Sequence, residues 1–391
     1  MSPVELETHA PTSFGEARLT SGRHGYVAYF PATIPRALDL PASTVRLLGE
    51  AEGALGRLAG VGRLLPNPDL LIRPYLLREA LSSTRIEGTQ ASMVEVFEAD
   101  AAGEAPNADV EEVVNYVAAM RWGLERLDEL PLSTRLLCEM HRRLMAGVRG
   151  RELAPGELRT SQNWIGAPGS TIETAQFVPP PPAELSALLA DWERFAHEQP
   201  ELPLLVQNAL LHSQFETIHP FLDGNGRLGR LLLVFFLIAR GRLTVPLLYL
   251  SAYLERQRQD YYDALQAIRE SGDPTPWIDL FLTAVETQAD DAVQRAQRIV
   301  ALRESYLQEA ATMGTPNALT LVDLICENPV LTTRSIEDRL DVSRPTALRL
   351  LRRMEEQGVL TETDSGARGQ RRYVARAMME AVGAWPAPRP G

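Results

Sequence analysis

The sequence of 391 residues contains no lysine, so arginine supplies all 39 of its basic side chains. This absence excludes a catalytic lysine, a Schiff base with a substrate and a phosphate-binding lysine of the Walker type. Together with the abundance of alanine and leucine, it indicates a biased genomic composition.

Cysteine and long apolar runs are also scarce. Cys138 and Cys326 lie far apart without the spacing of metal ligands, and the first residues do not resemble a signal peptide. The longest apolar run, residues 231–239, has about half the length that a membrane helix requires. We therefore expect a cytoplasmic protein that does not enter a membrane, with 231–239 as a buried core helix.

An excess of basic residues is missing as well, because the net charge is -12. Phosphate backbones need basic surface, so any contact with nucleic acid must be local. Apolar residues make up 45% and charged residues 23% of the chain, which is typical of a globular protein. The length is sufficient for two or three domains.

Helical spacing of apolar residues dominates the chain. A hairpin is expected within 159–182, where short apolar pieces flank a Gly and Pro turn. Residues 101–109 are expected to be a connection, and 65–68 a proline-rich break. The fold class is therefore mainly α. The predicted helices are 41–64, 75–86, 110–127, 133–145, 184–197, 203–218, 227–240, 253–270 and 277–306.

The densest chemical signal is the segment 219–230, His-Pro-Phe-Leu-Asp-Gly-Asn-Gly-Arg-Leu-Gly-Arg, between two apolar helices. Its glycines permit a tight turn, and the next helix directs free N–H groups and its positive dipole end into that turn. Arg227 and Arg230 share one face of that helix and can grip a polyphosphate. Asp223 is suited to a hard cation such as Mg²⁺, and His219 can accept a proton near neutral pH. These groups are the parts of a phosphoryl or nucleotidyl transfer site.

Residues 224–229 also read G-x-G-x-x-G, the dinucleotide-binding fingerprint. That fingerprint must follow a strand and precede an acidic residue about 20 positions later. Here the preceding segment is helical and the next 20 residues contain no acid. We therefore reject the dinucleotide-binding interpretation.

The segment 219–230 matches the H-x-F-x-D/E-G-N-G-R-x-x-R motif of Fic proteins at every defined position, and the chain resembles that family. The resemblance implies that His219 is the general base for a target hydroxyl and that Asp223 binds Mg²⁺. It implies transfer of AMP from ATP, because related phosphotransferase toxins lack the final arginine. The other motif residues are then expected to bind ATP: Gly224, Asn225, Gly226, Arg227 and Arg230.

Two further segments resemble parts of Fic proteins. Residues 83–88, Ser-Thr-Arg-Ile-Glu-Gly, resemble the inhibitory S/T-x-x-x-E-G/N motif, which implies that Ser83 and Glu87 belong to a self-inhibiting helix. A carboxylate beside Arg230 pairs with this arginine, which is then no longer available to the γ-phosphate of ATP. Residues 159–182 resemble the Fic flap, which pairs with an extended segment of the target protein. Either segment taken alone also fits an ordinary surface helix or hairpin.

Tyr261 and Tyr262 fall where the family places a tyrosine against adenine, and Tyr262 is the expected contact. The family often has asparagine seven residues later, whereas this chain has Arg269 at that position. Both tyrosines also fit plain helix packing. His141 and His212 are expected to be structural.

The C-terminal part resembles a winged helix-turn-helix, with helices at 320–327, 333–340 and 344–357 and strands at 359–363 and 371–374. Ser343 is expected to cap the recognition helix. The segment 320–376 contains ten Arg and nine acidic residues, a difference of +1, so a DNA partner and a protein partner both remain open. The arginines available for phosphates are Arg344, Arg349, Arg352, Arg353, Arg368, Arg371 and Arg372.

The sequence thus predicts an N-terminal helical region at 1–105, a Fic core at 106–290, a linker helix at 291–314 and a winged helix at 315–380. The expected activity is AMP transfer to a Ser, Thr or Tyr hydroxyl of a target protein, restrained by Glu87. Removal of AMP from modified protein and a nucleotide-sensing DNA-binding regulator are the alternatives. Mg²⁺ and ATP are the expected ligands, and the resemblance leaves a homodimer open.

Overall fold

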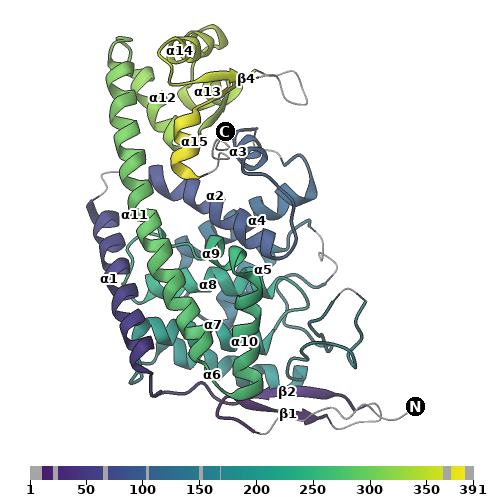
Figure 1. Ribbon diagram of the computed structural model, residues 1–391. Coiled ribbons are helices and arrows are strands. Elements are labelled where there is room, and N and C mark those ends of the chain that lie inside the picture. The colour runs from purple at the N-terminus through teal and green to yellow at the C-terminus, as the bar shows by residue number, and fades with distance from the viewer. Residues whose placement is uncertain are drawn as a thin grey trace, which may run out of the picture. The chain divides into compact units, whose positions relative to one another are not determined.

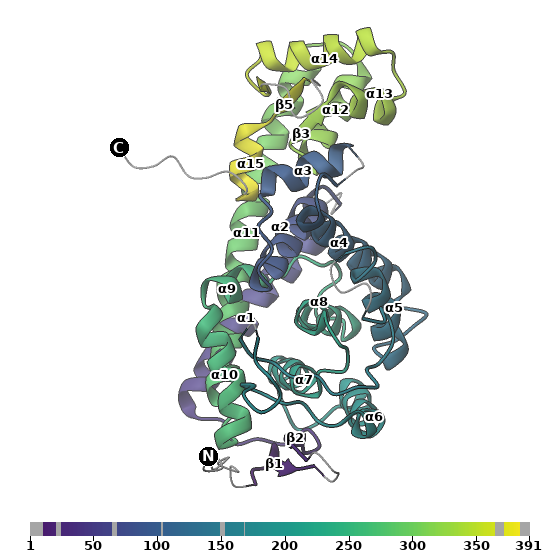
Figure 2. The ribbon, with the colours of Figure 1, turned by 90° about the vertical axis from the view of Figure 1, so that its right-hand side faces the viewer.

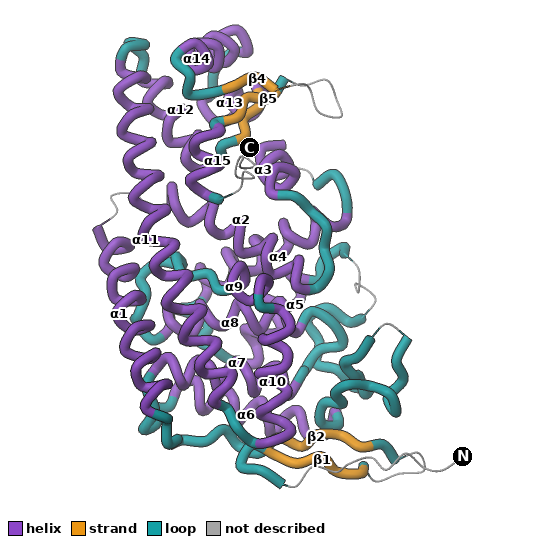
Figure 3. Tube along the Cα trace, viewed as in Figure 1, coloured by secondary structure: helices purple, strands orange, loops and turns teal. Residues whose placement is uncertain are grey.

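The computed structural model describes residues 11–20, 25–64, 69–102, 105–148, 153–167, 169–363 and 371–383. These residues are mainly helical, as the apolar spacing predicts, with two small antiparallel sheets (Figures 1 and 3). The chain divides into two units that are each assembled from distant segments. One unit comprises Met1–Ala54, Ala118–Arg242 and Tyr253–Thr287, and the other comprises Leu55–Val117, Leu243–Ala252 and Gln288–Gly391. Helices α1 (Ala42–Leu64), α4 (Ala108–Arg126) and α11 (Thr275–Ala311) contribute to both units. The predicted domain boundaries at 105, 290, 314 and 380 stay a prediction.

The first unit is built around α7 (Leu204–Ile218), whose residues from Leu205 onward are all buried. Figure 2 shows α8 (Asn225–Ala239) beside it, with α5 (Thr134–Leu144) and α6 (Leu185–His197) as neighbours. Polar side chains on a fully buried helix must find hydrogen-bond partners. Asn208 accordingly donates to the carbonyl of Leu233 on α8 at 3.0 Å. The run 231–239 is confirmed as part of a core helix.

The same unit contains α10 (Arg258–Ser271), a short 3-10 turn η1 (Pro182–Glu184) and an antiparallel pair, β1 (Gly15–Leu19) and β2 (Val27–Pro31). This pair was not predicted, because each strand has only five residues. The backbone N–H of Tyr29 on β2 donates to the carbonyl of Val178 at 2.9 Å. The pair therefore supports the segment that the sequence identifies as the flap.

The second unit contains α2 (Asp69–Ile86), α3 (Met93–Ala102) and α9 (Ser251–Arg256), of which α9 ends in the first unit. Helix α3 was not predicted, although its start has a sequence signal. Ser92 and Glu95 form a reciprocal capping box, with side chain to backbone distances of 2.8 and 3.2 Å. Hydrogen bonding of the Ser92 hydroxyl and backbone N–H to the Glu95 carboxylate lowers the pKa of Glu95.

The C-terminal segment contains the three predicted helices and two predicted strands in the predicted order: α12 (Pro316–Glu327), α13 (Thr333–Leu340), α14 (Arg344–Glu356), β4 (Thr361–Thr363) and β5 (Arg372–Val374). A strand between α12 and α13, β3 (Val330–Thr332), and a final helix, α15 (Arg376–Val382), were not predicted. The sheet order is β3-β5-β4, and Tyr373 pairs with Leu331 on one side and Glu362 on the other. Ser343 is the N-cap residue of α14, but its side chain makes no capping hydrogen bond and instead lies 3.1 Å from the hydroxyl of Thr346.

Several other details differ from the sequence prediction. The expected helix at 253–270 is two helices, α9 and α10, separated at Gln257. Among the described residues of 159–182, a single bridge between Ile165 and Phe177 replaces the expected hairpin strands. Arg368, the break at 65–68 and parts of the 101–109 connection lie outside the described residues.

None of the helices in the described part of the chain combines the length and the apolar character needed to span a membrane.

Candidate active site

His219 is the C-cap of α7 and has left-handed backbone angles, φ 48° and ψ 61°. A residue other than glycine rarely adopts these angles, and such strain is concentrated at functional sites. Its backbone N–H donates to the carbonyl of Phe215 at 2.9 Å, and its Nδ1 lies 3.4 Å from the carbonyl of Glu216. A proton on Nδ1 places the proton-accepting lone pair on Nε2.

The loop from His219 to α8 is closed by Asn225. Its side chain accepts from the backbone N–H of Phe221 at 2.9 Å and donates to the carbonyl of Phe221 at 2.8 Å. Gly224 is the N-cap with φ 77°, and a Cβ there would lie 2.8 Å from the sulfur of Met145. Asn225 and Gly224 therefore shape the turn, and Gly226 follows in the first turn of α8.

Asp223 lies just before α8, and Arg227 and Arg230 lie in the first turns of that helix. The guanidinium of Arg227 lies 3.6 Å from a carboxylate oxygen of Asp223. Arg227 and Arg230 are buried, at 4% and 2% exposure, while the Asp223 side chain is 44% exposed. This is a cationic helix N-terminus with one carboxylate at its rim, which suits a polyphosphate.

The carboxylate of Asp223 is also suited to bind a metal ion. One oxygen of Asp223 accepts from the backbone N–H of Gly224 at 2.6 Å, which orients the side chain. Within the described residues no group of three or more metal-binding side chains occurs. Mg²⁺ is usually held by one or two carboxylates together with phosphate oxygens and water, so a single oriented Asp223 fits it.

His141 on α5 holds this loop, a role that the sequence did not reveal. Its Nε2 lies 2.8 Å from the carbonyl of Asp223, and its Nδ1 accepts from the N–H of Gly156 at 2.8 Å. These contacts put the proton on Nε2. The ring stacks on Phe221 at 3.9 Å. Burial lowers the pKa of His141 to about 4, so the ring is neutral at pH 7.

Arg159 joins the segment 159–182 to the loop that begins at His219. Its Nε donates to the carbonyl of His219 at 2.8 Å, and its Nη2 donates to the carbonyl of Pro180 at 2.5 Å. Its backbone N–H donates to the carbonyl of Pro220 at 2.9 Å. Burial lowers the pKa of Arg159 to about 10, which leaves it charged. The side chain of Asn163 adds a hydrogen bond to the carbonyl of Phe221 at 2.9 Å.

The two tyrosines of α10 have different surroundings. Tyr261 is buried, and its hydroxyl lies 2.8 Å from Nε2 of His212, whose Nδ1 is 3.1 Å from the carbonyl of Gly229. His212 is thus structural, as predicted, and burial lowers its pKa to about 3. Tyr262 is half-buried beside Tyr261, with ring centroids 5.3 Å apart. Its contact with a nucleotide base stays a prediction.

Ser83 and Glu87 belong to the second unit. Ser83 lies in α2 and is fully buried, while Glu87 is exposed just beyond the end of that helix. Its backbone N–H donates to the carbonyl of Thr84 at 3.0 Å, and Gly88 follows with φ 100°. The end of α2 is therefore a tight turn that presents the Glu87 side chain at the surface.

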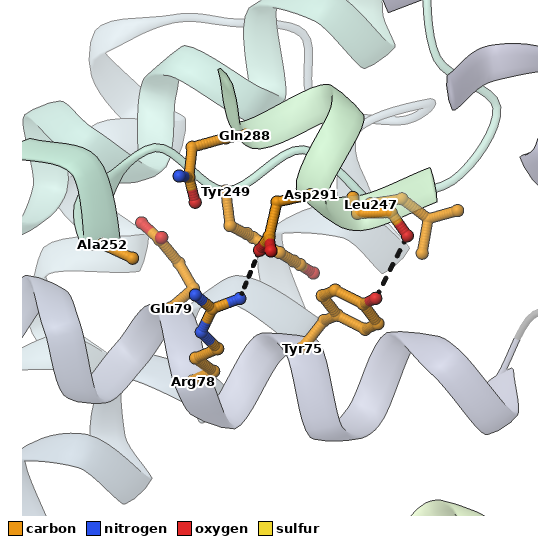
Figure 4. Close-up of a pocket in the computed structure, with 9 residues that line it drawn as sticks. Tyr75, Arg78, Glu79, Leu247, Tyr249, Ala252, Gln288 and Asp291 are labelled. Atoms are coloured by element: carbon orange, nitrogen blue, oxygen red, sulfur yellow. Dashed lines mark hydrogen bonds and ion pairs between the residues drawn. The ribbon is translucent and has the colours of Figure 1, made fainter. Parts of the chain in front are cut away.

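A polar pocket of about 10 Å³ anchors α2 (Figure 4). Arg78 pairs with Asp291 of α11 at 3.0 Å, and the hydroxyl of Tyr75 donates to the carbonyl of Ala292 at 3.2 Å. Buried Glu79 accepts from the backbone N–H of Ser251 at 3.1 Å. The volume suffices for about one water molecule, so this pocket fixes the helix and is not a substrate site.

Comparison with known proteins agrees with this arrangement. The family described as "Fic/DOC family N-terminal" matches residues 45–125, and "Fic/DOC family" matches residues 131–237. The chain therefore contains a Fic N-terminal region and a Fic domain. A third family, "Winged helix-turn-helix DNA-binding", matches residues 316–361.

Curated relatives include proteins named "Protein adenylyltransferase Fic". The relative from Drosophila yakuba is 26% identical over 298 residues, covering 72% of this chain and 54% of the relative. The relative from Drosophila grimshawi is 28% identical over 217 residues, covering 53% and 41%. The chain therefore spans about half the length of the curated Fic proteins it matches.

Among solved structures, a Fic family protein from Desulfovibrio desulfuricans G20 has a TM-score of 0.56 and 23% identity, covering 86% of this chain and 97% of that one. Fic-1 from C. elegans has a TM-score of 0.51 and 22% identity, covering 68% and 74%. These similarities show the Fic fold.

Proposed function

We propose that this Fic protein is an adenylyltransferase that transfers AMP from ATP to a Ser, Thr or Tyr hydroxyl of a target protein. One observation carries the proposal: His219 ends α7 within the same short loop that places Asp223, Arg227 and Arg230 at the start of α8. A proton acceptor, a carboxylate and two cations thus lie within twelve residues around one helix N-terminus, which is suited to an anion. The names of the curated Fic relatives support the same activity.

In this mechanism the target hydroxyl attacks the α-phosphorus of ATP while His219 accepts its proton. The bond from that phosphorus to the oxygen bridging the α and β phosphates breaks, and pyrophosphate leaves with the negative charge. Arg227 and Arg230 stabilise that charge, aided by the N–H groups of the first turn of α8. Asp223 would hold Mg²⁺, which neutralises phosphate charge when it is bound. The flap would align the target chain with His219.

We further propose that Glu87 restrains this activity. The resemblance of 83–88 to the inhibitory motif supports this role. The hydrogen bonds of α2 also support it, because they hold the helix that ends in a tight turn beside an exposed Glu87. A carboxylate that pairs with Arg230 competes with the γ-phosphate and leaves ATP in an unproductive position.

The experiment incubates wild type, Glu87→Gly and Glu87→Gly/His219→Ala with Mg²⁺ and ATP labelled on the α-phosphate, with and without a cell lysate. We expect strong protein labelling by Glu87→Gly, weak labelling by wild type and none by the double variant. The absence of labelling in all three proteins, with ATP binding intact, would count against the proposal and favour nucleotide sensing or AMP removal.

A second candidate function, DNA binding, is favoured by α14. Its buried face carries Ala347, Leu350, Leu351 and Met354, and its exposed face lines an open groove of about 480 Å³. Exposed arginines on a recognition helix are suited to DNA phosphates. The arginines that line this groove are Arg344, Arg349, Arg352 and Arg353.

Binding of Arg349→Gln/Arg352→Gln to labelled genomic fragments tests this second function. Each lost phosphate contact should reduce the slope of log affinity against log salt by about 1. If wild type shifts no fragment at low salt, α14 serves a protein partner.

A further inference from the structure

Arg269 is a buried cation that the proposed mechanism does not use. It lies on α10, two residues before the end of the helix, and its exposure is 8%. Burial lowers its pKa to about 10, so it keeps its charge at pH 7. A buried charge is costly unless its surroundings compensate it, so its partners indicate what it stabilises.

One partner is the flap. The guanidinium carbon of Arg269 lies 3.8 Å from the ring centroid of Phe177. Phe177 is also the residue where the two arms of the flap pair, since its N–H and carbonyl bond to Ile165 at 3.0 and 2.8 Å. A desolvated cation over an aromatic face is attractive, and the planar guanidinium can also stack. Arg269 thus holds the flap at its point of closure.

The other partner is the helix that carries His219. Nε of Arg269 lies 3.2 Å from the hydroxyl of Thr217, which itself donates to the carbonyl of Ser213 at 2.8 Å. Thr217 is in the last turn of α7, two residues before His219. The neighbouring carboxylate of Glu216 favours the charged form of Arg269. The guanidinium therefore contacts the turn that ends at His219.

We propose that Arg269 is a positioning residue for the target protein, one that fixes the flap relative to His219. The inference rests on the proposed function, because it assumes that the flap aligns a target hydroxyl with His219. Arg269 touches neither substrate in this account and acts through Phe177 and Thr217. It occupies the position where the family often has asparagine, so this chain has a cation at the base of the flap.

The test uses Arg269→Met, which keeps an apolar stem without the charge, and Arg269→Lys, which keeps the charge without the planar group. Phe177→Leu removes the ring. Arg240→Met is the matched control, since Arg240 also lies near an aromatic ring, that of Phe236, and donates to carbonyls away from the flap. The first readout is hydrogen exchange of the flap peptide around Ile165 and Phe177, measured with Glu87 intact and without ATP.

We expect Arg269→Met to reduce the protection of the flap from hydrogen exchange about tenfold. Arg269→Lys should reduce this protection nearly as much, and Arg240→Met should leave it unchanged. Arg269→Met/Phe177→Leu should be no worse than either single variant, because both remove the same contact. Unchanged flap protection in Arg269→Met, or an equal loss in Arg240→Met, would overturn the inference.

The second readout places the same changes in the Glu87→Gly protein. At saturating ATP, Arg269→Met should label lysate proteins at least tenfold more slowly, while the ATP affinity measured by calorimetry changes less than threefold. An equal loss of ATP affinity would overturn the target-positioning role. If Glu87→Gly itself labels nothing, the proposed function fails, and hydrogen exchange still decides whether Arg269 holds the flap.

Discussion

His219 combines a reactive ring with a backbone conformation that costs about 1 to 2 kcal/mol for a residue other than glycine. The cost is tolerated because fixed groups surround it. Phe215 accepts its N–H, and Arg159 donates to its carbonyl. The strain and the hydrogen bonds together set where the imidazole lies relative to α8.

Gly224 offers a sharp test of the anion-binding turn. In Gly224→Ala the new Cβ would meet the sulfur of Met145 and the ring of His141, in addition to the strain of φ 77°. The matched control is Gly241→Ala, with φ 67° and nothing within 4 Å. Calorimetry should show ATP affinity at least tenfold weaker in Gly224→Ala and nearly unchanged in Gly241→Ala. Equal affinities in the two variants would contradict the role of the turn.

His141 and His212 make stability depend on pH. Unfolded histidine binds its proton near pH 6.5, whereas the folded state lowers the pKa to about 4 for His141 and about 3 for His212. Stability is therefore complete above about pH 6.5 and falls as pH decreases toward 4, by about 1.4 kcal/mol per pH unit for each histidine. Urea denaturation at several pH values should show a shallower slope in His212→Gln. A slope identical to that of wild type would refute this assignment.

Helices α7 and α8 pack closely against each other at Gly229. A Cβ there would overlap the carboxylate of Glu216 and lie 3.1 Å from the ring of Phe215. Gly229→Ala should therefore destabilise the protein by about 1 to 3 kcal/mol, although alanine is the better helix former. Gly49→Ala in α1 is the control, because nothing lies within 4 Å and a gain of up to about 1 kcal/mol is expected. Thermal unfolding of both variants measures the difference, and a gain in both would contradict close packing.

The sequence predicted those elements that are determined by residues close together in the chain. The loop at 219–230 was predicted because all its reactive groups lie within twelve positions, and most helices were predicted from apolar spacing. His141 and Arg159 were not assigned to the site, because they reach the loop from 60 to 82 residues away in the chain. Contacts between residues so far apart in the chain leave no pattern in the local sequence. Helix α3 is different, since its Ser92 and Glu95 capping signal was present but overlooked.

In the second unit, the winged helix packs on α2, the helix that precedes Glu87. Helices α12 and α15 contact α2, and β3 contacts α3. Asn328 donates to the carbonyl of Phe97 at 3.0 Å and to Asp100 at 2.8 Å, and Arg73 of α2 binds the same Asp100 at 2.7 Å. The winged helix and the proposed inhibitory helix therefore share one polar junction.

Asn328→Ala should weaken this junction and lower stability by about 1 to 3 kcal/mol, because it leaves buried polar groups without their partner. We also expect faster labelling than in wild type, since α2 is less firmly held. Leu319→Ala, at an exposed position of α12, is the control. Labelling equal to wild type, despite a confirmed loss of stability, would separate the winged helix from the restraint on activity.

The central claim for the whole molecule is that AMP, and not a single phosphate, is transferred. The most direct measurement incubates Glu87→Gly with Mg²⁺ and a lysate in parallel reactions, one with ATP labelled on the α-phosphate and one with ATP labelled on the γ-phosphate. The account predicts protein labelling from the α-phosphate alone, loss of that labelling in Glu87→Gly/His219→Ala, and release of pyrophosphate. Labelling from the γ-phosphate, or none from either position while ATP still binds, would contradict it.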